Sequence, residues 1–235
     1  MSNSDRLCVV TGVGPGNGAS ISRKFAQEGY RVIMLARSVE RLQGIEKQIP
    51  NSISIPTNVG DREAVRKTFE MIRKEIGKVS VLVHNAGSGQ FKDFLNTSPE
   101  DFEQSWRVNA LGLLLCGQEA ARDMLELGGG AIVAIGATAS WRGGIKTAPF
   151  ASAKAAQRSL AQSMAKSLGP QNIHVSYVII DGMIDVPQTR ANFPDRPNDA
   201  FLNPDRLADT VFYLAHQDPT AWTFELDLRP YLEQW

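Results

Sequence analysis

Two kinds of apolar pattern alternate along the chain. Short, continuous apolar runs are separated by longer stretches in which apolar residues recur at every third or fourth position. The runs predict β-strands, and the stretches predict amphipathic helices. Runs such as Ala131–Ile135 have no polar face, which is typical of a strand covered on both sides in a parallel sheet. The predicted strands are Leu7–Thr11, Arg31–Ala36, Ser52–Pro56, Val79–His84, Ala131–Ile135, Val175–Ile180 and Thr223–Leu228.

Helical patterns follow most of these strands. Ser98, Pro99 and the acidic residues after them are typical of a helix N-terminus, and we expect the helix to run from Phe102 towards Leu127 with a bend or break on the way. By contrast, Gly182–Asn203 has no clear period and predicts a loop or a mobile lid. The other predicted helices contain Ile21–Glu28, Val39–Gln48, Arg62–Ile76, Phe150–Leu168 and Pro204–Ala215.

The alternation of strand and helix indicates the α/β class. It predicts a doubly wound, seven-stranded parallel sheet with helices on both faces. No repeat, low-complexity tract or linker divides the chain, and its 235 residues suit one domain of this kind. We therefore predict that residues 1–235 form a single domain.

Composition and charge exclude several classes of function. The chain has 25 Lys and Arg residues and 25 Asp and Glu residues, so it carries no electrostatic footprint for nucleic acid or an anionic membrane. Its polar first residues do not resemble a secretion signal, and no apolar stretch approaches the roughly 20 residues that span a bilayer. Cys8 and Cys116 lie in apolar surroundings, as reduced core cysteines do, and the three histidines lack metal-ligand spacing. We expect a cytoplasmic protein without a metal site that acts on a small molecule.

Glycines cluster directly after the first predicted strand, in Thr11-Gly12-Val13-Gly14-Pro15-Gly16-Asn17-Gly18. Gly12, Gly14, Gly16 and Gly18 let the backbone turn tightly and approach a pyrophosphate, which then rests on the amide groups at the positive end of the next helix. A plain structural turn can have a similar composition. The strand before and the helix after favour a dinucleotide-binding loop.

The spacing Thr-Gly-x-x-x-Gly-x-Gly resembles the short-chain dehydrogenase/reductase family, and further motifs follow in the family's order. Asn85-Ala86-Gly87 follows the fourth strand, where the family has the same tripeptide beside the adenine ribose. Asn109 matches the asparagine of the long fourth helix, and Lys154 matches the active-site lysine. Asp181-Gly182-Met183-Ile184 takes the place of the family's Pro-Gly-x-Ile, whose backbone flanks the nicotinamide. The resemblance covers nearly the whole chain and implies a Rossmann-like fold and an oxidoreductase.

Arg37 bears on the choice of cofactor. NAD-preferring members of the family usually end the second strand with an acid that accepts from the ribose 2′-hydroxyl, whereas this chain has Ala36 followed by Arg37. A guanidinium suits a 2′-phosphate, so the resemblance implies NADP(H) in preference to NAD(H), unless Arg37 is simply solvated. Pro15 stands where many NADP-dependent relatives have a second basic residue. Asn58-Val59 replaces the Asp-Val that usually flanks the adenine, and asparagine keeps an acceptor.

The resemblance also implies a set of four catalytic residues, of which this chain has two. In the family, a tyrosine transfers the proton, a lysine lowers the pKa of that tyrosine and holds the nicotinamide ribose, a serine binds the substrate carbonyl, and an asparagine supports a water chain. Asn109 and Lys154 are present, but Phe150 stands at the tyrosine position and Ala137 at the serine position. A positioned general acid contributes roughly 10²–10⁴ in rate, and an oxyanion donor on the order of 10²–10³. Ordinary ketone reduction is therefore not expected without a substitute donor.

Several hydroxyl groups are candidates for that donor. Thr138 and Ser140 follow the fifth strand and could reach the site, or could bond only the local backbone. Ser152 lies two residues from Phe150, so on a helix it points roughly 200° away. Thr147 stands where enoyl-reductase relatives have their tyrosine. The tyrosines of the chain lie elsewhere, at Tyr30, Tyr177, Tyr213 and Tyr231.

Two functions remain open at this stage. The first is an NADP(H)-dependent oxidoreductase with an atypical site that reduces an activated double bond or a carbonyl. Phe150-Ala151-Ser152-Ala153-Lys154 is similar to the Ser-Ala-Ser-Ala-Lys of dienoyl-CoA reductases, which also lack the usual tyrosine, so hydride addition to a conjugated C=C with water as the proton source stays open. The alternative is a catalytically inactive NADP(H)-binding sensor or partner protein.

The substrate pocket and the assembly are less defined. Trp141, Arg142, Lys146, Asp185 and Arg190 either line a substrate pocket or lie on the solvated surface. Family members pair through the helices that here contain Gly112–Glu126 and Ala155–Leu168, so the resemblance implies a homodimer or homotetramer.

Overall fold

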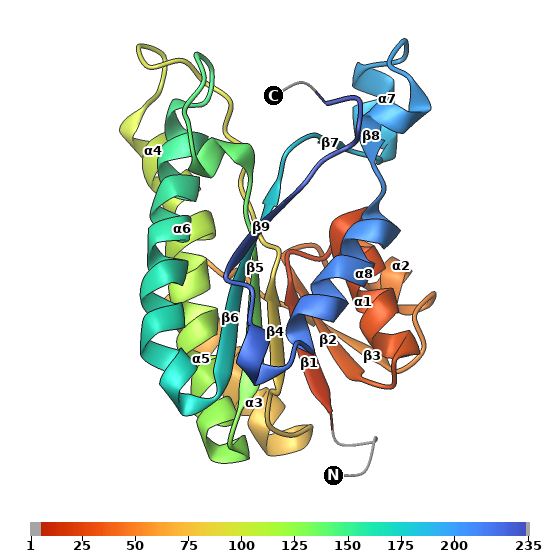
Figure 1. Ribbon diagram of the computed structural model, residues 1–235, viewed down its shortest axis with the longest axis vertical. Helices are drawn as coiled ribbons and strands as arrows, with labels where there is room; N and C mark the ends of the chain where they lie inside the picture. Colours follow the sequence, from red (N-terminus) through yellow and green to blue (C-terminus); the bar gives the residue numbers. More distant parts are fainter. Residues whose placement is uncertain (1–5, 234–235) are drawn as a thin grey trace.

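Seven parallel strands form one sheet in the computed structural model (Figure 1). The strands are β1 (Leu7–Thr11), β2 (Arg31–Ala36), β3 (Ser52–Pro56), β4 (Val81–His84), β5 (Gly130–Ile135), β6 (Ile173–Ile180) and β9 (Glu225–Leu228). They lie in the order β3-β2-β1-β4-β5-β6-β9, and every neighbouring pair is parallel. The structure describes residues 6–233, so the polar start at residues 1–5 and the last two residues lie outside the described part. The predicted doubly wound α/β fold is confirmed.

Helices cover both faces of this sheet (Figure 1). They are α1 (Asn17–Gln27), α2 (Val39–Glu46), α3 (Arg62–Glu75), α4 (Pro99–Trp106), α5 (Gly112–Leu127), α6 (Ala148–Leu168), α7 (Pro187–Asn192) and α8 (Pro204–Ala215). On one face α3, α5 and α6 bury apolar side chains such as Phe69 against Val9 and Ile132. On the other face α1, α2 and α8 cover Val10 and Val133, which directly follow Val9 and Ile132 in β1 and β5. Because successive strand residues point to opposite faces, β1 and β5, which contribute these four residues, are apolar along most of their length.

The long helix predicted beyond Phe102 is interrupted, as expected. Its start is a capping box, in which the Ser98 hydroxyl accepts from the Asp101 amide and the Asp101 carboxylate accepts from the Ser98 amide. A π-helical segment, Arg107–Leu111, separates α4 from α5. Segments of this kind are frequent at functional sites. Asn109 lies at its centre.

Two strands begin later than predicted. β4 begins at Val81 rather than Val79, because the Val79 amide donates to the buried Asp123 carboxylate of α5. β9 begins at Glu225 rather than Thr223, because the Thr223 amide donates to the Gln217 side chain. In both cases the amide has its partner outside the sheet.

The stretch Gly182–Asn203 contains short regular elements that the sequence did not predict. β7 (Met183–Ile184) pairs in parallel with β8 (Phe201–Leu202), and α7 lies between them. The Arg190 guanidinium of α7 pairs with Asp185 at 2.7 Å and lies 4.2 Å from the centre of the Phe201 ring. A loop without regular structure is therefore the wrong prediction here, because elements this short show no period.

The carboxyl ends of β1 and β4 meet where the strand order reverses. From β1 the chain continues outward to β2 and β3, and it then returns to β4 on the other side of β1. Ligands of doubly wound sheets bind in the crevice at such a switch point. The glycine loop after β1 and Asn85-Ala86-Gly87 after β4 both lie at this point.

Candidate functional site

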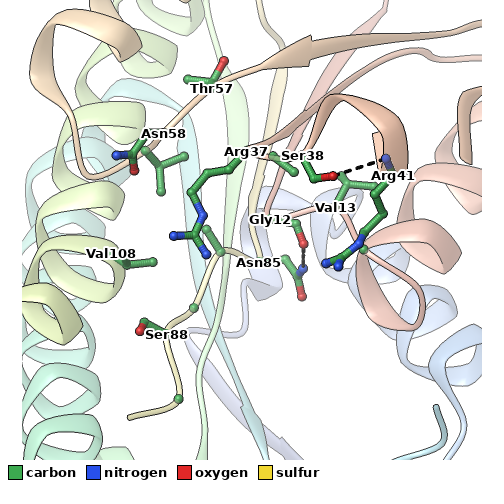
Figure 2. Close-up of a pocket in the computed structure, with 16 residues that line it drawn as sticks. Gly12, Val13, Arg37, Ser38, Arg41, Thr57, Asn58, Asn85, Ser88 and Val108 are labelled. Atoms are coloured by element: carbon green, nitrogen blue, oxygen red, sulfur yellow. Dashed lines mark hydrogen bonds between the residues drawn. The ribbon is translucent and has the colours of Figure 1, made fainter. Parts of the chain in front are cut away.

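A cavity of about 800 Å³ opens at the switch point (Figure 2). Residues from the ends of β1, β2, β3 and β4 surround it, together with residues of α2 and the π-helical segment. Its lining comprises Gly12, Val13, Gly14, Ala36, Arg37, Ser38, Arg41, Thr57, Asn58, Val59, Asn85, Ala86, Gly87, Ser88, Gly89 and Val108. Eight of the predicted cofactor-binding residues are among them: Gly12, Gly14, Arg37, Asn58, Val59, Asn85, Ala86 and Gly87. Five others, Gly16, Gly18, Lys154, Gly182 and Ile184, lie outside this lining.

Two glycines of the loop occupy positions that no other residue fits. Gly12 has φ +68°, and a Cβ there would lie 2.4 Å from the Ala86 Cα. Gly16 has φ +101°, and a Cβ there would lie 2.5 Å from Val186 Cγ1. The side chain of Asn85 ties the two loops together, because its amide nitrogen donates to the Gly12 carbonyl at 2.9 Å. The resulting surface consists largely of backbone atoms. A Cβ added at Gly14 would have no other heavy atom within 4 Å, so open space remains beside this residue.

Two arginines stand on the β2 side of the cavity (Figure 2). Arg37 follows β2, and Arg41 lies in the first turn of α2, whose N-cap Ser38 accepts from the Arg41 amide at 3.3 Å. Within the described residues, neither guanidinium forms an ion pair. Arg41 was missed by the sequence analysis, although its place four residues after Arg37 is a usable signal. Arg41 supplies a second basic side chain on the β2 side of the cavity, whereas Pro15 takes the position where many NADP-dependent relatives have one.

The third side of the cavity is mainly apolar. Val59 and Val108 are buried and face the cavity, with Ala36 nearby. The Asn58 side chain lies at the rim, where its oxygen accepts from the Gly60 amide at 3.1 Å. That bond holds the turn before α3, so one acceptor position of Asn58 is already used. This side of the cavity therefore presents mainly aliphatic side chains.

Lys154 and Asn109 meet behind Gly87. A Cβ on Gly87 would lie 3.4 Å from the Asn109 Oδ1 and 3.8 Å from the Lys154 Nζ. The Asn109 amide nitrogen donates to the carbonyls of Ser88 and Ser105, at 3.2 and 2.9 Å. Its Oδ1 is buried and has no hydrogen-bond partner within residues 6–233. A buried acceptor beside a buried ammonium is a position where a donor group from a ligand or water fits.

The Lys154 ammonium is itself held by two acceptors. It donates to the Ile135 carbonyl and to the Gln157 Oε1, each at 2.9 Å. The residue is 5% exposed, and burial lowers the pKa of Lys154 to about 7. Lys154 therefore changes charge near neutral pH, unlike an exposed lysine.

Ala137 and Phe150 come from two different elements of the chain. Ala137 follows β5 and precedes a 3₁₀ turn, Thr138–Ser140. Phe150 lies in the first turn of α6, and its ring centre is 5.3 Å from that of Phe91. Phe91 is 64% exposed, so Phe150 packs against an exposed ring. Neither Ala137 nor Phe150 carries the hydroxyl of the family's serine and tyrosine.

Most of the candidate substitute donors are engaged with other groups or lie on other elements. The Thr138 hydroxyl donates to the Asp181 carboxylate at 2.5 Å, and its oxygen lies 3.3 Å from the Ile180 carbonyl. Tyr177 is fully buried behind α6, and burial raises the pKa of its phenol well above the usual range. Ser152 and Thr147 donate to backbone carbonyls one turn away. Ser140 is buried. Tyr30 pairs with His216, and Tyr213 and Tyr231 are exposed on α8 and in the C-terminal stretch.

The residues considered for a substrate pocket divide into two groups. Asp185 and Arg190 pair with each other inside the lid stretch, so Arg190 is not free to bind an anion. Arg142 and Lys146 are exposed, and the Trp141 indole donates to Glu225 at 3.4 Å. The predicted Ile184 lies beside Gly16, and Gly182 lies against Pro230 of the C-terminal stretch. Within residues 6–233, no helix has the length and apolar character to cross a membrane.

Comparison with known proteins agrees with this architecture. Residues 6–197 match the sequence profile of the short chain dehydrogenase family. Carbonyl reductase family member 4 of Danio rerio is 32% identical over 216 residues, which span 89% of this chain and 90% of that protein. A crystal structure of a short-chain dehydrogenase from Rhodopseudomonas palustris is 32% identical, with a TM-score of 0.82, and covers 98% of this chain and 100% of its own. A metagenomic short-chain oxidoreductase in complex with NADP is 27% identical, with a TM-score of 0.85, over 99% of this chain and 100% of its own. The chain belongs to the short-chain dehydrogenase/reductase family.

Proposed function

We propose that the protein is an NADP(H)-dependent oxidoreductase whose active site has Ala137 and Phe150 in place of the usual serine and tyrosine. The observation that carries the cofactor assignment is a single cavity that combines a glycine backbone surface with two arginines, Arg37 and Arg41, that form no ion pair within residues 6–233. The 27% identical metagenomic relative, solved with NADP, supports the same assignment.

The residues present fit each part of the dinucleotide. The backbone at Gly14 and the N-terminus of α1 suit the pyrophosphate. Arg37, Ser38 and Arg41 supply donors for a 2′-phosphate, and charge-assisted bonds of this kind are worth about 1.5–3 kcal/mol each. The free acceptor of Asn109 and the ammonium of Lys154 suit the hydroxyls of the nicotinamide ribose.

Fluorescence titration with NADPH and NADH tests this assignment. The natural protein is expected to bind NADPH more tightly, and Arg37→Ala is expected to weaken NADPH about 10–100-fold while changing NADH little. Arg41→Ala is expected to act in the same direction. Arg31→Ala is the matched control, because Arg31 is exposed at the opposite end of β2. Equal affinities for the two nucleotides, or none, would remove the role given to Arg37.

The chemistry we propose is reduction of an activated C=C bond. Bound NADPH would supply the hydride. Reduction of a ketone leaves an alkoxide, a strong base that needs a proton donor in place, whereas a conjugated double bond leaves a delocalised enolate that water can protonate. The side chains of Ala137, Phe150 and Phe91 are apolar and offer no proton donor. They therefore support reduction of a conjugated double bond better than reduction of a ketone. Lys154 and Asn109 keep their positions for binding the ribose.

A panel of enones and matched ketones at saturating NADPH tests the reaction. We expect NADPH oxidation with some enones and little with their saturated ketone counterparts. Oxidation of ketones at a comparable rate would overturn the proposal. A second candidate, a non-catalytic NADP(H)-binding protein, is favoured by the engagement of Thr138 and Tyr177 with other groups. Tight NADPH binding with no oxidation on either class would support it.

We also propose that the chain forms a homodimer or homotetramer in the cytoplasm through α5 and α6. A groove of about 260 Å³ lies between these helices, lined by residues including Gly117, Ala121 and Met164. A Cβ on Gly117 would lie 2.9 Å from the end of Met164, so the helices pack closely there. Light scattering tests the assembly, and Ala121→Arg is expected to reduce it to monomers.

A further inference from the structure

Gln157 is a buried polar residue that contacts both remaining members of the catalytic set. It lies on α6 one turn after Lys154 and is fully buried. Its Oε1 accepts from the Lys154 Nζ at 2.9 Å and from the Tyr177 hydroxyl at 3.2 Å. Its Nε2 donates to the Asn109 carbonyl at 3.0 Å. One amide therefore joins α6, the π-helical segment and β6.

These partners fix the orientation of the amide. Lys154 and Tyr177 present donors on one side, and the Asn109 carbonyl presents an acceptor on the other. The reversed amide would set donor against donor and acceptor against acceptor. The contact between the Gln157 oxygen and the ammonium is therefore determined by its surroundings.

We propose that Gln157 is a positioning residue that holds Lys154 in its charged form with one proton directed towards the cofactor. The proposal rests on the proposed binding of NADP(H). Gln157 and the Ile135 carbonyl take two of the three protons of the ammonium. The third proton is left for a ligand beside Gly87. The Lys154 Nζ would lie 3.8 Å from a Cβ added at Gly87.

The surroundings make Lys154 the group that titrates here near neutral pH. Burial, with a contribution from the Lys154 charge, lowers the pKa of His84 at the end of β4 to about 3. Burial raises the pKa of Tyr177 on β6, and it raises the pKa of Cys116 on α5 to about 12. These three groups stay uncharged across the neutral range. An acceptor on the ammonium favours its charged form, so removing the Gln157 oxygen should let Lys154 lose its proton at lower pH.

Two substitutions at Gln157 should move this titration in opposite directions. NADPH is titrated between about pH 6 and about pH 9 against the natural protein, Gln157→Leu and Gln157→Glu. Affinity is expected to fall as pH rises, because the ammonium is lost. The midpoint of the fall should move down by about one pH unit in Gln157→Leu and up by about one in Gln157→Glu. Both variants lose the bond to the Asn109 carbonyl, so that loss cannot produce opposite shifts. Midpoints that coincide in all three proteins would overturn the proposal.

A readout without cofactor separates this inference from the proposed function. The free energy of unfolding of the unliganded protein should begin to rise with pH where Lys154 loses its proton, and this onset should shift in the same two directions. If NADPH binds to none of the proteins but the onsets shift, the proposed function fails and the role of Gln157 in charging Lys154 stands. Tyr177→Phe is the control, since it removes a bond to Gln157 without touching the Lys154 Nζ. An equal shift of the onset in Tyr177→Phe would contradict a direct effect of Gln157 on the charge of Lys154. If Gln157→Leu does not fold, the upward shift in Gln157→Glu remains decisive.

Discussion

The two ends of the cleft differ in which parts of the chain form them. At the cofactor end, the surface is largely backbone, set by Gly12 and Gly16 at positive φ and completed by Arg37 and Arg41. At the catalytic end, the proposed chemistry depends on a few side chains, of which Lys154 and Asn109 are kept while Ala137 and Phe150 carry no hydroxyl. The proposed function therefore makes binding and catalysis separable: the backbone surface is retained, and the two side chains at positions 137 and 150 are expected to change the reaction.

The largest effect is expected from restoring the two hydroxyls. The double variant Ala137→Ser/Phe150→Tyr should gain ketone reduction by about 10²–10⁴-fold, because a general acid of this kind contributes that much. The rate of ketone-dependent NADPH oxidation measures it. The single variants serve as controls and should gain much less, since such residues act as a unit. No gain in a double variant that folds and binds NADPH would show that the catalytic end differs by more than these two side chains.

The cofactor end is tested by two neighbouring glycines. Gly12→Ala should lower the free energy of unfolding by about 2–4 kcal/mol, because the left-handed backbone and the Cβ contact with Ala86 are both unfavourable. Gly14→Ala should change it by less than about 0.5 kcal/mol, since no atom lies within 4 Å of the new Cβ. Gly14→Ala should nevertheless weaken NADPH binding, because Gly14 lines the cavity. Chemical denaturation and fluorescence titration give the two quantities. Unchanged NADPH affinity in Gly14→Ala would place the pyrophosphate elsewhere.

Lys154 links the two ends and makes stability depend on pH. Its folded pKa of about 7 lies below the unfolded value of about 10.4, so the unfolded chain binds more protons between these values. The contribution of Lys154 to stability should therefore rise with pH across this window, by about 2–3 kcal/mol from pH 7 to pH 9, and is read as the difference between the natural protein and Lys154→Met. In Lys154→Met the rise should disappear. A rise that persists in Lys154→Met belongs to another group.

The smallest effect is expected in the stretch Gly182–Asn203. Asp185 and Arg190 are 37% and 33% exposed, so Asp185→Asn should lower stability at neutral pH by less than about 1 kcal/mol. The Arg190 hydrogen bonds lower the pKa of Asp185, so its contribution is present above the unfolded pKa and is lost as pH falls through the folded one. Denaturation at neutral and acid pH measures the difference. A larger loss would mean that this pair holds the whole lid stretch in place.

The fold was predictable because its signals are local. Most of the strands are apolar runs, and β3 and β9 alternate apolar with polar residues. The glycine loop follows directly in sequence from β1. The break in the long helix was expected, but its π-helical form was not, and the elements inside Gly182–Asn203 were missed because two to six residues show no period. Gln157 was missed for another reason. A glutamine on a helix looks the same in sequence whether it is exposed or fully buried against a lysine, and only the packing of α6 on β6 distinguishes the two.

The separation of binding from ketone chemistry is tested most directly by recording NADPH fluorescence and ketone-dependent NADPH absorbance on one sample of the natural protein. The account predicts saturable NADPH binding with no significant oxidation when simple ketones are added. Rapid oxidation by simple ketones would contradict it, because a protein donor would then be acting where Phe150 and Ala137 offer none.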